Sequence, residues 1–141
     1  MPYITDAVLA SAVAASQTLA SAASLPAYFN AIIPTANLFA YNRIRNVLFD
    51  RGYTAAQLDL WDERTNWNEA VGVTVAFWKA SKGDEDRGEA FRREYVQQME
   101  DLVKTRIVIA GVITDPAGSM GRVGHGDFAT STDLHSMDDE L

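Results

Sequence analysis

The chain has 141 residues and a net charge of −7, so a nucleic-acid-binding surface is not expected to be its main function. Apolar residues make up 48% of the chain and charged residues 22%, which excludes disorder of the whole chain and permits one domain with a modest core. Cysteine is absent, which excludes disulfides and thiolate metal sites.

Residues 5–24 are rich in alanine and serine and predict a helix that Thr5 or Asp6 can cap. Helical spacing gives it a thin apolar stripe that includes Val8, Leu9 and Val13. Because Asp6 is the only charge in the first 42 residues, we expect this smooth helix to pack against another surface. The sequence predicts neither a secretory signal nor a membrane span, which needs about 18 apolar residues.

The stretch SLPAYFNAIIPTAN predicts an irregular link, because Pro26 and Pro34 each disfavour helix in the residue before them. A helix is then expected over residues 37–51, and Gly52 can adopt the left-handed backbone that ends it. Its predicted apolar stripe is Leu38, Tyr41, Ile44, Val47 and Leu48.

Thr54 and Gln57 have the spacing of a capping box, which predicts the start of a further helix. Trp61 lies on the inner face of that helix, and a break follows near Arg64–Asn66. The strongest helical periodicity comes next and ends at Gly83. Its predicted buried residues are Trp67, Ala70, Val71, Thr74, Phe77 and Trp78.

Residues 88–106 predict a last helix with Tyr95, Met99 and Leu102 on its buried face. The β-branched segment Ile107–Thr114 reads as an extended strand that needs a pairing partner, such as another subunit. Residues 115–141 hold six acids and one base and are rich in glycine and serine, so we expect a flexible acidic arm.

These elements predict an all-α fold, a small helical bundle of about four helices with a short extended segment and a flexible C-terminal arm. Residues 1–114 form the predicted helical domain, with core helices over about 37–106 and the extended segment at 107–114. The arm covers residues 115–141.

Residues with metal-binding or catalytic chemistry occur, but not in the pattern of a site. His125 and His135 lie in the arm without fixed partners, and no helix follows the glycines of GRVGHG to form a phosphate loop. The run Asp84–Asp86 lacks the ligand ladder of an EF-hand and suits a helix start.

Three carboxylates flank two of the tryptophans, as in some glycosidases: Asp62, Glu63 and Glu69. Adjacent helical residues do not face each other, so this pattern predicts no catalytic pair. The spacing of Trp61, Trp67 and Trp78 favours core packing over a ligand cage. We therefore expect no enzyme activity, no cofactor and no metal.

The pattern Y-N-x-I-x-x-x-L-x-x-R-G-Y-T-x-A-Q-L-x-x-W-D, from Tyr41 to Asp62, resembles a segment of head–tail connector (adaptor) proteins of tailed bacteriophages. The later A-F-W-K-A and E-Y-V-Q-Q-M-E-D-L-V-K-T-R-I-V-I-A-G stretches are similar to that class as well. The resemblance covers roughly residues 37–114 and leaves out both ends of the chain.

The resemblance implies a subunit of a dodecameric ring below the portal, at the neck of the virion, with host cytoplasm as its location before assembly. Its implied partners are the portal protein, further copies of itself and the next neck or tail-completion protein. DNA would pass through the ring without specific binding, which an acidic surface favours.

Apolar residues at the two ends are the predicted partner-binding residues: Leu9, Val13, Ile107, Ile109, Val112, Ile113, Met120, Phe128 and Leu134. The alternative from a different class is a cytoplasmic helical binding or regulatory module whose Trp-lined groove takes a peptide or a small ligand.

Overall fold

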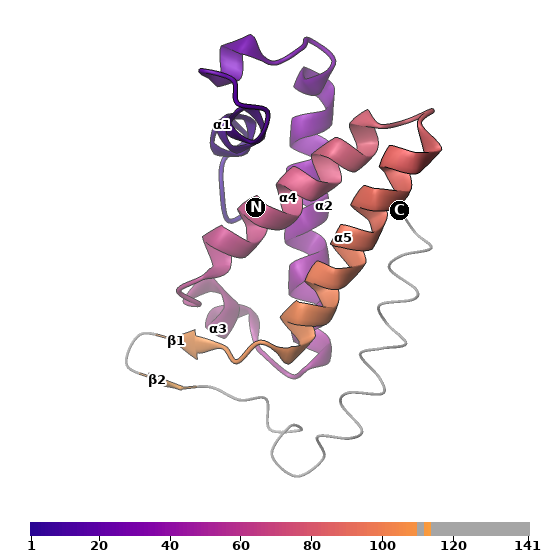
Figure 1. Ribbon diagram of the computed structural model, residues 1–141. Coiled ribbons are helices and arrows are strands. Elements are labelled where there is room, and N and C mark those ends of the chain that lie inside the picture. The colour runs from indigo at the N-terminus through magenta and orange to yellow at the C-terminus, as the bar shows by residue number, and fades with distance from the viewer. Residues whose placement is uncertain (110–111, 114–141) are drawn as a thin grey trace. The chain divides into compact units, whose positions relative to one another are not determined.

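The structure is a computed structural model that describes residues 1–109 and 112–113 (Figure 1). The described chain is mostly helical with almost no strand, which confirms the predicted small all-α fold. In chain order the elements are α1 (Asp6–Ser16), the 3₁₀ turn η1 (Ala22–Ser24), α2 (Phe29–Asp50), α3 (Ala55–Asp59), α4 (Arg64–Ala80), α5 (Glu85–Lys104), β1 (Val108–Ile109) and β2 (Val112–Ile113).

The chain divides into two compact units, each with its own buried side chains. The first comprises Met1–Asn42 and Thr65–Tyr95, and the second comprises Arg43–Arg64 and the chain from Val96 onward. Leu9, Val13, Phe29, Ile33, Ala36, Ala40, Val71, Val75, Ala76 and Tyr95 are buried in the first unit. The buried apolar residues of the second are Ile44, Val47, Leu48, Tyr53, Leu58, Trp61, Met99, Leu102, Ile107 and Ile109.

A buried pair of side-chain amides holds the N-terminal segment in the first unit. Asn68 Nδ2 donates to Asn37 Oδ1 at 2.9 Å, and the two residues are 0% and 1% exposed. The Tyr3 amide donates to Asn68 Oδ1 at 3.0 Å, and Asn37 Nδ2 donates to the Ile4 carbonyl and to Asp6 Oδ1, both at 2.9 Å. Buried amides are tolerated when hydrogen-bonded, so this network fixes where the chain enters α1.

Helix α1 ends at Ser16, so the prediction of one helix over residues 5–24 is wrong. Two short structures replace its second half, a turn and then η1, which has no buried residue. The sequence offers no glycine or proline here, and alanine-rich sequence by itself favours a continued helix.

The turn after α1 is a Schellman motif in which Thr18 takes the place usually held by glycine. Thr18 has φ +58°, and its amide donates to the Ala15 carbonyl at 3.0 Å. The Leu19 amide donates to the Ala14 carbonyl at 2.9 Å, which completes the motif. A β-branched residue is strained in the left-handed region, so this turn stores strain.

Helix α2 begins at Phe29 and runs through Pro34, where the sequence predicted an irregular link. The Pro34 nitrogen cannot donate to the carbonyl of Asn30, an exposed residue. The helix therefore lacks one backbone hydrogen bond in its second turn. Burial of Phe29 and Ile33, which are 1% and 5% exposed, favours the helical path. Farther along, Leu38 is 49% exposed, which corrects its predicted place in the apolar stripe.

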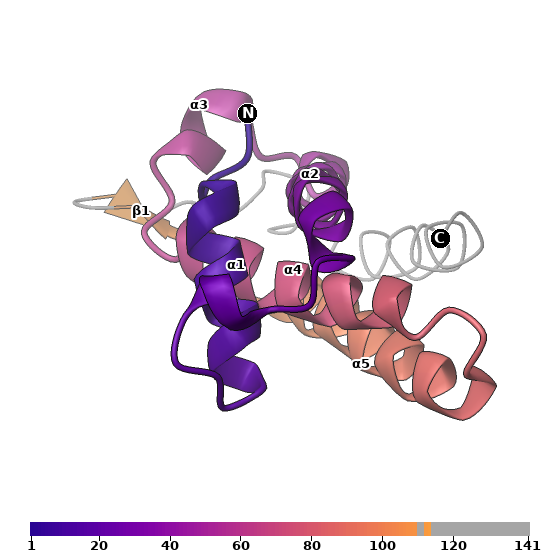
Figure 2. The ribbon, with the colours of Figure 1, turned by 90° about the horizontal axis from the view of Figure 1, so that it is seen from above.

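The buried face of α4 is rotated from the predicted one. Ala70 is exposed and Trp67, Phe77 and Trp78 are only half-buried, whereas Val71 and Thr74 are buried as predicted. The rotation follows from close approach of α1, which lies beside α4 in both views (Figure 1, Figure 2). The observed stripe is Asn68, Val71, Gly72, Val75 and Ala76.

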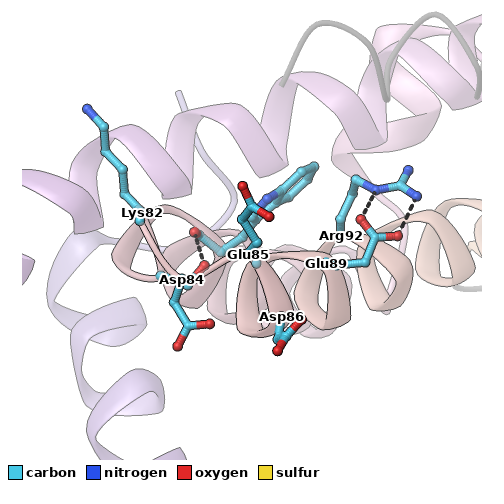
Figure 3. Close-up of a pocket in the computed structure, with 10 residues that line it drawn as sticks. Lys82, Asp84, Glu85, Asp86, Glu89 and Arg92 are labelled. Atoms are coloured by element: carbon cyan, nitrogen blue, oxygen red, sulfur yellow. Dashed lines mark hydrogen bonds and ion pairs between the residues drawn. The ribbon is translucent and has the colours of Figure 1, made fainter.

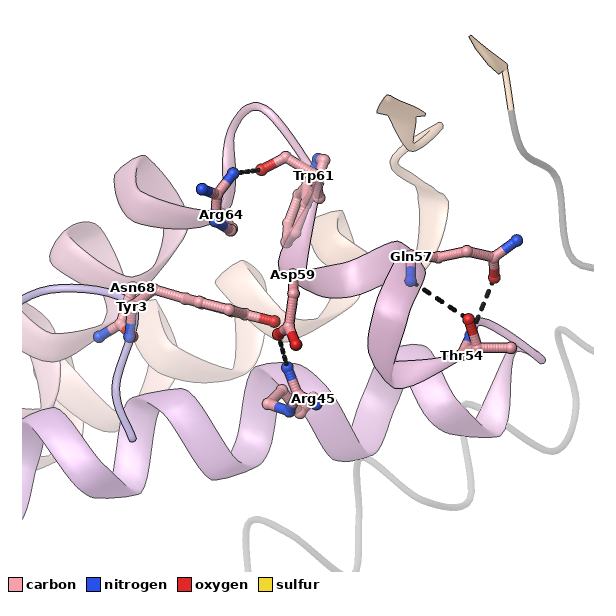
Figure 4. Close-up of polar contacts among 8 residues, drawn as sticks. All are labelled: Tyr3, Arg45, Thr54, Gln57, Asp59, Trp61, Arg64 and Asn68. Atoms are coloured by element: carbon pink, nitrogen blue, oxygen red, sulfur yellow. Dashed lines mark hydrogen bonds and ion pairs between the residues drawn. The ribbon is translucent and has the colours of Figure 1, made fainter. Parts of the chain in front are cut away.

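In the second unit, capping chemistry joins α2 to α3 as predicted. Gly52 has φ +98°, and Thr54 and Gln57 form the reciprocal capping box, with hydrogen bonds of 3.2 and 2.9 Å (Figure 4). Arg51 Nη1 donates to the Thr105 carbonyl at 2.8 Å, so a guanidinium satisfies a carbonyl that follows the C-terminal end of α5.

The extended segment finds its pairing partners within its own chain. β1 and β2 form an antiparallel pair with Val108 opposite Ile113 and Ile109 opposite Val112. Trp61 and Ile109 add an isolated antiparallel bridge. Within the described residues the predicted extended segment thus contains two short strands, and their pairing uses backbone hydrogen bonds for which the sequence suggested another subunit.

We expect Thr18→Gly to stabilise the protein by about 1 kcal/mol, because glycine adopts the left-handed backbone without strain. Ala90→Gly, on an exposed part of α5, should lower stability by about 1 kcal/mol. Urea unfolding measures both changes. Equal losses for the two variants would contradict the strain at Thr18.

Asn68→Leu is expected to destabilise the protein by about 2–4 kcal/mol, since it leaves the half-buried Tyr3 amide and the buried Asn37 Oδ1 without these bonds. Asn30→Leu, at an exposed position, should change stability by less than about 0.5 kcal/mol. Thermal or urea unfolding of the two variants makes the comparison. A small loss for Asn68→Leu would rule out a structural role for the amide pair.

Candidate functional site

A charged hollow of about 590 Å³ lies where α4 gives way to α5 in the first unit. Trp78 lines it from α4, and ionisable side chains line it from the turn and from α5 (Figure 3). Those labelled are Lys82, Asp84, Glu85, Asp86, Glu89 and Arg92. It combines an aromatic surface with four acids and two bases.

The acids at the turn act in helix initiation, as the sequence predicted. Asp84 Oδ1 accepts a hydrogen bond from the Arg87 amide at 3.1 Å, and Glu85 and Asp86 occupy the first turn of α5. Negative charge at a helix N-terminus is favourable because the first amides point outward. Gly83 has φ +94° and open space around its α-carbon, so it forms the turn before α5.

Glu89 is held in its charged form by two arginines. Arg92 Nη2 lies 2.8 Å from Glu89 Oε1 and Arg92 Nε lies 2.9 Å from Oε2 (Figure 3). Arg93 Nε lies 3.3 Å from Oε1. The hydrogen bond from Arg92 is the main cause that lowers the pKa of Glu89 from 4.5 to about 2. A carboxylate with so low a pKa is a poor general base at neutral pH.

The three carboxylates near the tryptophans do not form a pair on one helix face. Asp62 and Glu63 are exposed neighbours in the second unit, and Glu69 is exposed on α4 in the first. Within the part of the chain that the structure describes, no three acidic or histidine side chains cluster as metal ligands would. His125, His135 and the GRVGHG glycines lie outside the described residues.

The tryptophans have different environments. Trp61 is 1% exposed, which confirms its predicted place in the core. Its backbone forms an isolated β-bridge with Ile109, and its carbonyl accepts a hydrogen bond from Arg64 (Figure 4). Trp67 and Trp78 are half-buried and lie eleven residues apart on α4, about 16 Å along its axis. Trp78 packs against Tyr95, with ring centroids 5.7 Å apart.

Four of the predicted partner-binding residues are buried in their own units. Leu9, Val13 and Ile107 are 0% exposed and Ile109 is 7% exposed. In this conformation their side chains are covered by other residues of the same chain. A partner protein would therefore contact the exposed residues around them and not these four side chains. Val112 and Ile113 form β2, and Met120, Phe128 and Leu134 lie outside the described residues.

Three exposed apolar residues are not among the predicted partner-binding residues, and one of them, Val8, belongs to the predicted apolar stripe of the N-terminal helix. Val8 is 44% exposed on α1, next to the buried Leu9, and Val108 is 46% exposed between Ile107 and Ile109. Leu60, after α3, is 62% exposed. A residue adjacent to a buried one points to a different side of its helix or strand, which is the signal that could have identified them.

None of the described helices is both long and apolar enough to cross a bilayer. Comparison of the chain with protein-family models, curated proteins and solved structures finds no match.

Arg92→Ala should raise the pKa of Glu89 from about 2 toward 4.5, because it removes the strongest partner of the carboxylate. Arg93→Ala should raise it less, and NMR titration of the Glu89 side chain measures both. Since the folded pKa is depressed, the pair stabilises the fold above about pH 4.5 and loses that effect as pH falls to about 2. An unchanged pKa in Arg92→Ala would contradict the assignment.

Proposed function

We propose that the chain is a head–tail connector (adaptor) subunit of a tailed bacteriophage. Copies of it form a ring below the portal, at the neck of the virion, and contact the next neck or tail-completion protein. DNA passes through the ring without specific binding. The subunit is structural, and its function is to present surfaces to the portal and to its own neighbours.

The observation that carries the proposal is the folding of the segment Tyr41–Asp62. Gly52 ends α2, Thr54 and Gln57 start α3, and Trp61 is buried. The patterned residues on which the resemblance rests therefore act as caps and core. A recognisable pattern made of scaffold residues supports a structural role more than a catalytic one.

Exposed apolar side chains in both units support contacts with other chains. Val8 and Tyr28 are 44% and 57% exposed in the first unit, and Leu60 and Val108 are 62% and 46% exposed in the second. Single exposed apolar residues are common, but the core of a protein interface is built from residues of this kind.

The charge of the chain also favours a channel role. The net charge is −7, and acids outnumber bases by 19 to 12. Like charges repel the phosphates of DNA, so the counterion release that drives DNA binding is absent. An acidic subunit is therefore suited to a channel along which DNA slides.

The test combines the purified chain with the portal protein encoded in the same genome and follows particle mass by mass photometry and negative-stain imaging. We expect a ring of this chain on the portal. Leu60→Asp should reduce ring occupancy by roughly tenfold or more, because it places a charge in an apolar contact. Asn46→Asp, an equal charge change at an exposed polar position of α2, is the matched control.

Circular dichroism should be unchanged in both variants, which separates a lost contact from a lost fold. Deletion of residues 116–141 should likewise leave the helical signal intact and impair assembly. A chain that remains monomeric beside intact portal rings, and instead binds a peptide or small ligand, would refute the connector proposal in favour of the binding module.

A further inference from the structure

Helix α1 packs against α4 at Leu9. Leu9 lies directly over Gly72, where an added β-carbon would be only 2.9 Å from Leu9 Cδ1. Leu9 and Val13 are 0% exposed and Ala14 is 1% exposed. Glycine at position 72 therefore forms a notch that accepts the Leu9 side chain of an approaching helix.

The segment before α1 adds contacts that also converge on α2 and α4. Asn68 accepts from the Tyr3 amide and Asn37 donates to the Ile4 carbonyl. The Tyr3 ring meets the Tyr41 ring edge-on, with centroids 5.0 Å apart. Residues 1–16 thus carry one half of each contact, and the other half is supplied by α2 and α4.

The link from α1 to α2 has no buried residue and contains a strained residue, Thr18, near its start. None of residues 17–28 is buried, and this length of chain can span about 40 Å when extended. Thr18 has φ +58°, which a β-branched residue adopts only under strain. The alanine-rich sequence 17–24 favours continuation of α1, a conformation that would release this strain.

We propose that residues 1–16 are an exchangeable element that docks on a second copy of this chain. In the exchanged dimer, α1 of each copy occupies the Gly72 notch and the Asn37–Asn68 pair of the other, and Thr18 leaves the left-handed conformation. A strained hinge linking otherwise identical contacts is the arrangement that favours domain swapping. The proposal does not depend on the connector role.

The balance between the two forms is set by the hinge. The contacts are the same in both, and the closed monomer is favoured by an effective concentration in the millimolar range. Release of strain at two hinges favours the dimer by roughly thirtyfold. Exchange is therefore expected at concentrations of tens of micromolar.

The experiment uses the absence of cysteine in the chain. Ala12 on α1 and Glu69 on α4 line the same shallow hollow, so Ala12→Cys in one copy and Glu69→Cys in another report docking between copies. The two full-length variants are mixed at about 20 µM, far below the effective concentration, and joined with a short bis-maleimide. We expect a mixed crosslinked dimer on denaturing gels.

Thr18→Gly in both partners should lower the yield of this dimer by roughly tenfold or more, because the closed turn is then unstrained. Thr18→Ala, which favours a continuous helix and is still unsuited to the left-handed turn, should retain it. A double-cysteine chain crosslinked within itself before concentration should remain a monomer by light scattering.

Three results would overturn the proposal: no mixed dimer, equal yields for Thr18→Gly and Thr18→Ala, or dimerisation of the chain already crosslinked within itself. The last would mean that copies associate side by side without exchange. All the readouts use this chain alone, so a failure leaves the connector proposal to its own test.

Discussion

The Asn37–Asn68 hydrogen bond is the contact on which the arrangement of the first unit depends. Two amides that are 1% and 0% exposed would destabilise the core if they lacked partners, and they find them in the backbone of Tyr3 and Ile4. A hydrogen-bonded pair in an apolar interior is satisfied in few geometries. Helix faces made of alanine and valine, by contrast, can pack against each other in several registers. The pair therefore fixes the register of a helix whose own side chains are too small to specify one.

The second unit is held together by polar contacts between segments that are distant in the sequence. Arg51 donates to the Thr105 carbonyl, and Arg45 forms a 2.7 Å ion pair with Asp59 on α3. The Trp61–Ile109 bridge joins the end of α3 to the strand after α5. Segments far apart in the chain are thus tied by directional polar contacts, which leaves Leu60 and Val108 free to face outward.

Local sequence signals predicted the structure where a single residue decides the conformation. Gly52, Gly83 and the Thr54–Gln57 box follow from backbone geometry and side-chain reach, and each is found where the sequence placed it. The end of α1 and the start of α2 could not be predicted this way. Thr18 accepts a glycine conformation, and Pro34 is carried within a helix by the burial of its neighbours.

The predicted site residues show the same limit. Periodicity identified Leu9 and Ile109 as important apolar residues, but it could not tell whether the chain itself or a partner covers them. The rotated face of α4 arises because Gly72 lets α1 approach closely, a tertiary effect without a local signal. The sequence did not predict the charged hollow beside Trp78. It did predict that the acids of Asp84–Asp86 lie at the start of a helix.

The notch at Gly72 has a consequence for how this sequence can change during evolution. A β-carbon gained at position 72 would lie 2.9 Å from Leu9 Cδ1, so the Leu9 side chain would have to shift, and any shortening at position 9 leaves a void over α4. Neither change is easily accepted alone, whereas a larger residue at 72 together with a smaller one at 9 preserves the volume between the helices. Positions 9 and 72 are therefore expected to covary among descendants of this chain, and that covariation would reveal the contact between α1 and α4.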